Sequence, residues 1–486
     1  MLDPNACYAA LTARDARFDG LFFVGVATTG IYCRPVCPAR TPGRDRCNFY
    51  RSPAEAERAG YRACFRCRPE LAPAATAAAV DAMPRLAARA AALIDEGYLN
   101  ERGVDDLAAA LGVSARHLRR ATEEQLGVSP VDLAQSRRLA LAKQLLQDTR
   151  LGLAELALAS GFRSLRRFNA SFLERFGRPP SELRRAHPDP DAGAGLSLRL
   201  DLREPFDWPR LLGFLRGRAI PGVEQAGADE YRRVVHLDGH TGLLRVRRDD
   251  RPGALRADLS PALAPVLMPL VARLRRLFDL DARPDLIADA LARDPALAPH
   301  LRRRPGLRVP GSLDPFEMSA RAVLGQQVSV RAATTLAGRL VARFGAPLAR
   351  PPGEGLTHRF PTAAELAQRD PAELAAVGLP AARAASLHAL ARAFAADALP
   401  GLHADPDEFA AALVAVPGIG DWTAQYLVLR ALHHPDAFPA GDLVLRRALG
   451  GVTARAAVAR AAAWRPWRAY AVVHLWTAHS EEGAPT

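Results

Sequence analysis

Four of the six cysteines in this chain of 486 residues form two close pairs, and their spacing constrains the N-terminal fold more than any other feature. TTGIYCRPVC holds Cys33 and Cys37, and YRACFRC holds Cys64 and Cys67. A C-x3-C and a C-x2-C pair, joined by a loop long enough to fold back, can converge tetrahedrally on one zinc ion. Disulfides are the alternative, which the short paired spacings disfavour. Cys47 lies close enough in sequence to compete for the metal.

The composition indicates a large, basic chain. With 49% hydrophobic residues over this length, we expect three or four domains. No run of eighteen apolar residues and no leader pattern is visible, so we expect a cytoplasmic, nucleoid-associated protein without a membrane partner. The formal charge of +13 favours a polyanionic partner, nucleic acid first, which the motifs below narrow to double-stranded DNA; a genomic base-composition bias explains an arginine-rich chain equally well. Lys143 is the one lysine.

Two small, proline-punctuated stretches at 71–84 and 186–195 read as linkers. Between them the pattern is helical, and after the second linker alternating segments such as LSLRLDL and YRRVVHLD indicate antiparallel strands. We therefore predict a multidomain, mainly α chain with a small α+β zinc-binding head at 1–72, an all-α segment at 85–186, an antiparallel α/β segment at 195–305 and an all-α segment at 306–482.

The head resembles a known sensor domain over nearly its whole length. DGLFFVGVATTGIYCRPVCPAR and NFYRSPAEAERAGYRACFRCRPE are similar to the N-terminal domain of Ada, which senses methyl phosphotriesters. The resemblance implies that Cys33 is both a zinc ligand and the acceptor of a methyl group from an alkylated DNA phosphate. We expect Arg34, Arg40 and Arg66 to steer the phosphate, and loss of one thiolate charge to tighten DNA binding. A purely structural zinc module is the alternative.

The helical middle carries two helix-turn-helix patterns. In the first, Gly112 is expected to make the turn and Ser114 to cap the second helix; Gly161 and Ser164 repeat this arrangement. Two such units in tandem resemble the AraC-type regulator domain. That resemblance implies operator binding, transcription activation and RNA polymerase as a partner, with DNA contacts from Arg116, Arg119, Arg166 and Asn169. Each of these arginines could instead belong to a solvated helix face.

VPGIGDWTAQYLVLRAL predicts a helix end, a tight loop with Gly418 and Gly420, and a new helix. Its first N–H groups, with Thr423 beside them, could bind a DNA phosphate, with a monovalent cation at the hairpin. FPAGDLVLRR then places Asp442 at the start of an apolar helix, where helix capping is the ordinary role.

A hairpin and aspartate at this distance resemble the helix-hairpin-helix, Gly/Pro-Asp superfamily of DNA glycosylases. With DWPRLLGFLRGRA, DPFEMSARAVLGQQVSV and WRPWRAYAVVHLW, the resemblance extends to AlkA-type 3-methyladenine glycosylases from about residue 196 onward. It implies a TBP-like antiparallel subdomain before an all-α helix-hairpin-helix domain. Asp442 would stabilise an oxocarbenium-like sugar or activate water. The pocket for a flipped, cationic alkylpurine would be lined by Trp422, Tyr426, Trp476 and Phe214.

Departures from the family pattern sharpen this reading. Trp422 stands where strand-nicking relatives carry a Schiff-base lysine, which predicts a monofunctional enzyme acting through water. No cysteine follows Cys67, so neither an iron-sulfur cluster nor an O6-methylguanine acceptor site is expected. Gln327 stands where the family pattern has a leucine that fills the gap left by the flipped base. Gly441 stands where that pattern has a second acidic residue, directly before Asp442. The alternative function is a DNA-binding regulator whose glycosylase-like domain is inactive.

Overall fold

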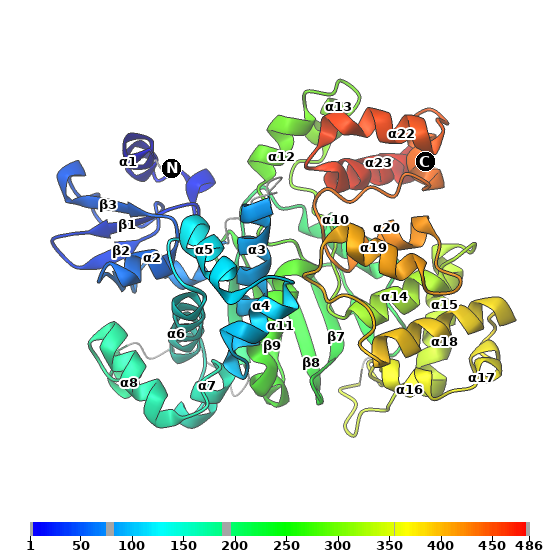
Figure 1. Ribbon diagram of the computed structural model, residues 1–486, viewed down its shortest axis with the longest axis horizontal. Coiled ribbons are helices and arrows are strands. Elements are labelled where there is room, and N and C mark those ends of the chain that lie inside the picture. The colour runs from blue at the N-terminus through cyan, green and yellow to red at the C-terminus, as the bar shows by residue number, and fades with distance from the viewer. Residues whose placement is uncertain (1–2, 74–81, 187–195, 354, 483–486) are drawn as a thin grey trace. The chain divides into compact units, whose positions relative to one another are not determined.

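The computed structural model describes residues 3–73, 82–186, 196–353 and 355–482 (Figure 1). These fall into two compact units. Unit 1 comprises residues 1–203, 248–275 and 280–283, and unit 2 comprises residues 204–247, 276–279 and 284–486. Most of both predicted linkers, at 74–81 and 187–195, lies outside the described residues. Within the described ranges, no helix combines the length and the apolar character that crossing a membrane requires.

The head of unit 1 is a four-stranded sheet in the order β3-β1-β2-β4, with two helices beside it (Figure 1). β1 pairs antiparallel with β2 and β3, whereas the short β4 runs parallel to β2. Asp3 and Ser52 cap the two helices with their side-chain oxygens. The elements are α1 (Pro4–Ala13), β1 (Phe23–Val26), β2 (Ile31–Cys33), β3 (Cys47–Tyr50), α2 (Pro53–Arg58) and β4 (Arg62–Ala63).

The helical middle contains the two predicted helix-turn-helix pairs, joined by the long α6. Gly112 and Gly161 make the turns at φ 70° and 84°, where a side chain would be strained. The Ser114 and Ser164 hydroxyls accept N–H bonds in the first turns of α5 and α8. The helices are α3 (Ala82–Asp95), α4 (Val104–Ala110), α5 (Ala115–Leu126), α6 (Pro130–Asp148), α7 (Leu153–Ala159), α8 (Leu165–Phe176) and α9 (Pro180–Ala186).

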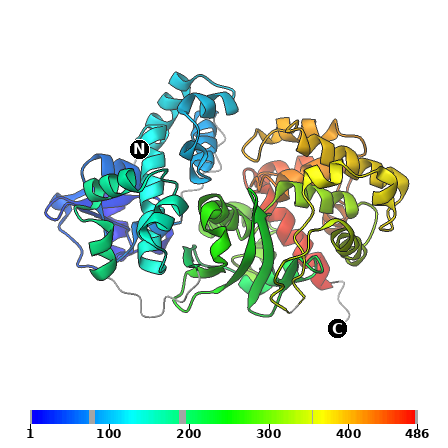
Figure 2. The same cartoon turned by 90° about the horizontal axis from the view of Figure 1, so that it is seen from below.

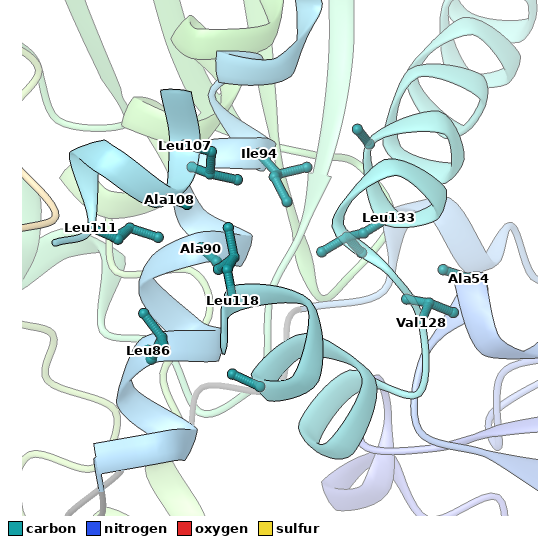
Figure 3. Close-up of a cluster of buried hydrophobic side chains, with 12 residues drawn as sticks. Ala54, Leu86, Ala90, Ile94, Leu107, Ala108, Leu111, Leu118, Val128 and Leu133 are labelled. Atoms are coloured by element: carbon teal, nitrogen blue, oxygen red, sulfur yellow. The ribbon is translucent and has the colours of Figure 1, made fainter. Parts of the chain in front are cut away.

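The first helix-turn-helix pair shares one apolar core with its neighbours. Figure 3 shows Leu107, Leu111 and Leu118 converging with Ile94 of α3. Ala54 of α2 belongs to the same cluster, so the head and the helical middle share buried surface within unit 1. Burial of such apolar area is the main term that holds these short helices in place. Unit 1 also contains the antiparallel pair β5 (Leu196–Asp201) and β9 (Ala254–Leu259), and most of α11 (Leu267–Leu277).

Unit 2 combines an antiparallel meander with a helical cluster. The helices from α14 to α20, coloured yellow-green to orange, gather together in Figures 1 and 2. The meander consists of β6 (Glu224–Ala226), β7 (Glu230–Leu237) and β8 (His240–Arg248). The helices are α10 (Trp208–Arg216), α12 (Pro284–Leu291), α13 (Ala298–Arg303), α14 (Pro315–Leu324), α15 (Val330–Phe344), α16 (Ala363–Ala367), α17 (Pro371–Ala375), α18 (Ala381–Ala395), α19 (Pro406–Val414), α20 (Asp421–Arg430), α21 (Leu443–Ala448), α22 (Ala454–Ala461) and α23 (Arg468–Glu482).

Candidate metal centre and base pocket

The paired cysteines converge at the end of strands β2 and β4. Cys33 ends β2 and Cys64 follows β4, and the parallel pairing of these strands brings the two residues together. Cys37 and Cys67 lie in the turns that follow. The four Sγ atoms lie within 4.8 Å of one another, and all four residues are buried. This donor set fits the tetrahedral four-thiolate coordination that zinc takes.

Backbone amides also point at this sulfur cluster. The N–H groups of Arg34 and Arg66 donate to Cys67 and Cys64 Sγ, each at 3.4 Å, which stabilises thiolate charge. Hydrogen bonding with the neighbouring thiols, led by Cys33, lowers the pKa of Cys37 to about 7 and also lowers that of Cys64. The same contacts raise the pKa of Cys33. Four thiolates this close together would repel one another, and a bound cation would offset that repulsion.

The arginines expected to steer a phosphate occupy different environments. Arg40 and Arg66 are exposed, as that role requires. Arg34 differs from the expectation, because it is buried and its guanidinium is already paired. Its Nε donates to Asp19 Oδ1 at 2.8 Å and its Nη1 to Asp201 Oδ2 at 2.7 Å. Arg34 thus fixes the loop between the first two cysteines, and its own guanidinium is not offered to a phosphate at the surface.

A buried polar network attaches the zinc head to α6. Lys143, which is completely buried, donates to the Cys64 carbonyl at 3.0 Å and pairs with Glu70 at 2.7 Å. Arg68 bridges Glu70 at 3.2 Å and Asp148, at the end of α6, at 2.7 Å. Glu70 and Arg68 follow the second cysteine pair, whereas Lys143 and Asp148 belong to α6, which joins the two helix-turn-helix pairs. These contacts therefore pack the cysteine head and the helical middle together within unit 1.

The predicted DNA-contacting side chains of the helical middle lie on the outside of α5 and α8. Arg116 and Arg119 are exposed on α5, and Arg166 and Asn169 are exposed on α8. The face of α8 that packs inward carries the phenylalanine stripe instead, with Phe168 fully buried. This is the distribution that a recognition helix needs.

The glycine loop between α19 and α20 is tightly specified. Gly418 has φ 83°, and a Cβ there would lie 1.8 Å from Ser386 Oγ, so only glycine fits. Gln326 Nε2 donates to the Gly418 carbonyl at 3.1 Å and to Thr423 Oγ1 at 3.3 Å. Thr423 is buried, so its hydroxyl braces the loop. Gly420 caps α20, whose first N–H groups have no partner within the helix.

Asp442 caps α21 and also accepts two indole N–H bonds. Its Oδ1 accepts from Leu445 N at 2.7 Å and from Trp476 Nε1 at 3.0 Å, while its Oδ2 accepts from Trp422 Nε1 at 3.0 Å. Three donors fix both oxygens of a carboxylate that is 8% exposed. Asp442 therefore has the ordinary role of a helix cap, and its position between the two indoles is compatible with the predicted role at a site, which stays a prediction.

The four predicted aromatic residues line one pocket with Asp442. This pocket, of about 730 Å³, lies within unit 2. Trp422 and Tyr426 stack with ring centroids 5.4 Å apart and planes at 11°, and Trp476 lies 6.3 Å from Tyr426. Phe214 comes from α10 and is half-buried. The structure thus brings together residues from three distant stretches of sequence.

Arginines of the same pocket were not predicted. Arg430 Nη1 donates to the Tyr426 hydroxyl at 2.8 Å, and the Arg218 guanidinium lies 3.8 Å from the centre of the Phe214 ring. Burial is the main cause that lowers the pKa of both arginines. Burial opposes ionisation of Tyr426, but Arg430, Arg218 and Arg321 outweigh it and lower the Tyr426 pKa. These cations weaken the attraction that an aromatic cleft alone would exert on a cationic purine.

A sequence signal for one of these arginines existed. Arg430 follows Tyr426 by four residues and Trp422 by eight, which places it on the same helical face as the two rings. Arg218 belongs to the motif DWPRLLGFLRGRA, but nothing in that stretch distinguishes a pocket arginine from the surface arginines of an arginine-rich chain. Gln327 is exposed between α14 and α15 with φ 56°, a strained conformation at the expected wedge position.

Comparison with known protein families gives four matches along the chain. They are the metal binding domain of Ada (residues 6–70), a helix-turn-helix domain (107–186), the AlkA N-terminal domain (197–314) and the HhH-GPD superfamily of base excision DNA repair proteins (320–467).

Whole-chain relatives agree with this domain order. The probable bifunctional transcriptional activator/DNA repair enzyme AlkA of Mycobacterium tuberculosis is 41% identical over 98% of this chain and 96% of its own. DNA-3-methyladenine glycosylase 2 of Escherichia coli is 37% identical over 57% of this chain and 95% of its own. The structure of a 3-methyladenine DNA-glycosylase from Archaeoglobus fulgidus, 22% identical, shares the fold over 59% of this chain and 99% of its own, with a TM-score of 0.51. The chain therefore belongs to the AlkA family of bifunctional transcriptional activator/DNA repair enzymes.

Proposed function

We propose that the chain is a DNA repair glycosylase that excises alkylated purines such as 3-methyladenine, fused to a regulator that senses methylated DNA phosphates. The observation that carries the excision activity is the position of Asp442, which lines a pocket of aromatic rings while two of those rings orient its carboxylate. The family membership and the glycosylase names of the relatives support the same reading.

The excision step is hydrolytic in this proposal. The bond between C1′ and the base nitrogen breaks, its electrons leave with the base, and a water oxygen bonds to C1′ while its proton is released. Asp442 faces the sugar as positive charge develops there and stabilises it, or accepts the proton of the water. The one lysine, Lys143, is buried in unit 1, so no lysine amine of this pocket can form a Schiff base. Gly420 and the start of α20 would hold a DNA phosphate, with a monovalent cation at the hairpin.

Replacing Asp442 with Asn tests the excision claim. Asparagine caps a helix as well as aspartate does, so α21 is retained while the negative charge is lost. We expect release of 3-methyladenine and 7-methylguanine from alkylated duplex DNA to fall by about 100-fold or more, the range for removal of one charge-stabilising group. Asp407→Asn, at an exposed position of α19, is the control and should keep full activity. Equal release by the Asp442 variant would leave the inactive-regulator reading as the better one.

The sensor step in this proposal is a methyl transfer to Cys33. A bond forms between Cys33 Sγ and the methyl carbon as the bond from that carbon to the phosphate oxygen breaks, and the phosphodiester leaves as an anion. Zinc bound by the four cysteines would supply thiolates at neutral pH. The exposed Arg40 and Arg66 would attract the phosphate. The exposed arginines of α5 and α8 would then bind an operator, and RNA polymerase would be the partner in activation.

Mass spectrometry of the intact chain tests this transfer. After incubation with DNA that carries methyl phosphotriesters, the wild type should gain one methyl group on Cys33 and the Cys33→Ala variant none. Cys47→Ala is the matched control, because Cys47 is buried nearby but lies outside the four-sulfur cluster. Zinc content is measured in parallel. A methyl group on another residue, or none on the zinc-loaded wild type, would show that the head is only a structural module.

A further inference from the structure

Five arginines line the base pocket, and Arg218 is held by fewer acceptors than its neighbours Arg321 and Arg430. Arg218 follows α10, and Arg321 and Arg430 line the same pocket. A guanidinium has five N–H donors, and a buried one is normally matched by acceptors or by a carboxylate. The three arginines differ sharply in how far this matching is complete.

Arg321 is neutralised by a buried ion network. It pairs with Glu224 at 2.6 Å and Glu317 at 3.1 Å, and Arg233 pairs with the same two carboxylates at 3.2 and 2.6 Å. Two arginines face two glutamates, so this network has no net charge. It forms a rigid wall of the pocket and leaves no cation for a ligand.

Arg430 is held by acceptors at all three nitrogens. Its Nε donates to the Pro310 carbonyl at 2.6 Å, its Nη2 to the Gly311 carbonyl at 3.3 Å and its Nη1 to the Tyr426 hydroxyl at 2.8 Å. Arg430 therefore positions Tyr426, and its donors are already committed within the protein.

Arg218 is in a different state. The carbon of its guanidinium lies 3.8 Å from the centre of the Phe214 ring, and its Nη1 donates to the Phe214 carbonyl at 3.4 Å. The Tyr426 hydroxyl is its other hydrogen-bonding neighbour. Within the ranges that the structure describes, no carboxylate forms an ion pair with it. A guanidinium beside an aromatic ring, with donors that no carboxylate of the protein takes, suits a planar ligand that offers an acceptor on its edge.

We propose that Arg218 determines specificity by donating to a carbonyl oxygen of the flipped base, a contact that oxopurine lesions gain in addition to those they share with aminopurine lesions. This inference rests on the proposed glycosylase function. Hypoxanthine and 7-methylguanine present O6 as an acceptor, whereas the amino group of 3-methyladenine presents N–H donors to the N–H donors of Arg218. Excision of 3-methyladenine then depends on the aromatic rings and Asp442 without this contact, and loss of the Arg218 donors weakens excision of the carbonyl-bearing lesions alone.

Single-turnover excision by the full chain tests the proposal with two lesion pairs. Hypoxanthine and N6-methyladenine are both neutral, and 7-methylguanine and 3-methyladenine are both cationic, so each pair exchanges the 6-carbonyl acceptor for an N6–H donor at constant charge. Arg218→Met keeps the apolar stem and removes every donor. We expect it to lower excision of the carbonyl-bearing member of each pair by roughly 10- to 100-fold, the range for a hydrogen bond to a charged group, and to leave the other member within about threefold.

The control is Arg216→Leu, two residues earlier and outside the pocket, which removes the same charge. For each pair, it should keep the wild-type ratio between the excision rates of the carbonyl-bearing lesion and its partner lesion. An equal fall for both members of each pair, or no change, overturns the proposal. If the Met variant fails to fold, Arg218→Lys keeps the charge but not the planar fork, and should shift both ratios in the same direction by a smaller factor; unchanged ratios overturn the proposal. Wild-type chain that excises none of the four lesions would instead refute the glycosylase function itself.

Discussion

Asp442 caps a helix and lines the aromatic pocket at the same time. The carboxylate oxygen that caps α21 also accepts the Trp476 indole, and the other oxygen accepts the Trp422 indole. Helix capping therefore fixes the direction in which the charge faces, and the two indoles fix the rings beside it. A side chain held by three donors loses little conformational entropy when a substrate arrives, which is the benefit of preorganisation.

His474 of α23 gives the molecule an acid-sensitive point. Burial, with a smaller effect of His300, lowers its pKa to about 4. The unfolded state takes up a proton as the pH falls below about 6.5, but the folded state does so only near 4, so stability present above 6.5 is lost between these values. Lowering the pH from 7 to 5 should therefore reduce the free energy of unfolding by about 2 kcal/mol through the titration of His474.

His474→Gln should remove that part of the pH dependence. Urea unfolding followed by tryptophan fluorescence measures it, because all five tryptophans lie in unit 2 with His474. If the free energy of unfolding differs between pH 7 and pH 5 by the same amount in the variant as in the wild type, His474 titrates normally.

Individual residues were predicted from two kinds of signal. The four cysteines stand out by their paired spacing, whereas Asp442 and the pocket rings were identified through the resemblance to helix-hairpin-helix glycosylases. Arg218 and Arg34 could not be assigned from the sequence, because an arginine in an arginine-rich chain looks the same whether it is exposed, ion-paired or in a pocket. Only its neighbours in space, such as Asp201 for Arg34, decide between these states.

At the scale of elements, the helix-turn-helix pairs followed from local chemistry. Gly112 and Gly161 adopt the positive φ that the turns require, and Ser114 and Ser164 supply the caps, so sequence alone specifies these joints. The attachment of the head to α6 was not predictable, since it depends on one buried lysine that meets a carbonyl and a carboxylate about seventy residues away.

Lys143→Met tests that attachment. Removal of the ammonium leaves Glu70 with Arg68 as its remaining partner, and we expect unit 1 to lose about 3 kcal/mol, as for one broken buried pair. Hydrogen exchange of α6 peptides measures the loss locally. The double variant Lys143→Met, Glu70→Leu should recover part of it, because no buried charge is then left unpaired. Equal protection in wild type and single variant would show that the pair does not hold α6.

At the scale of the whole molecule, the proposal assigns two electrophilic carbons to two separate sites. The cysteine cluster in unit 1 would take a methyl group from a phosphate, and the Asp442 carboxylate in unit 2 would assist cleavage at a sugar. Each site draws its residues from its own unit, so the two chemistries should be separable by single substitutions.

The most direct measurement uses one alkylated duplex with the wild type, Cys33→Ala and Asp442→Asn chains. Mass spectrometry then reports the methyl group gained by the protein and the free bases released from the DNA. The account predicts that the wild type shows both products, that Cys33→Ala releases bases without gaining a methyl group, and that Asp442→Asn gains the methyl group without releasing bases. Base release that survives in Asp442→Asn, or methyl uptake that survives in Cys33→Ala, would contradict it.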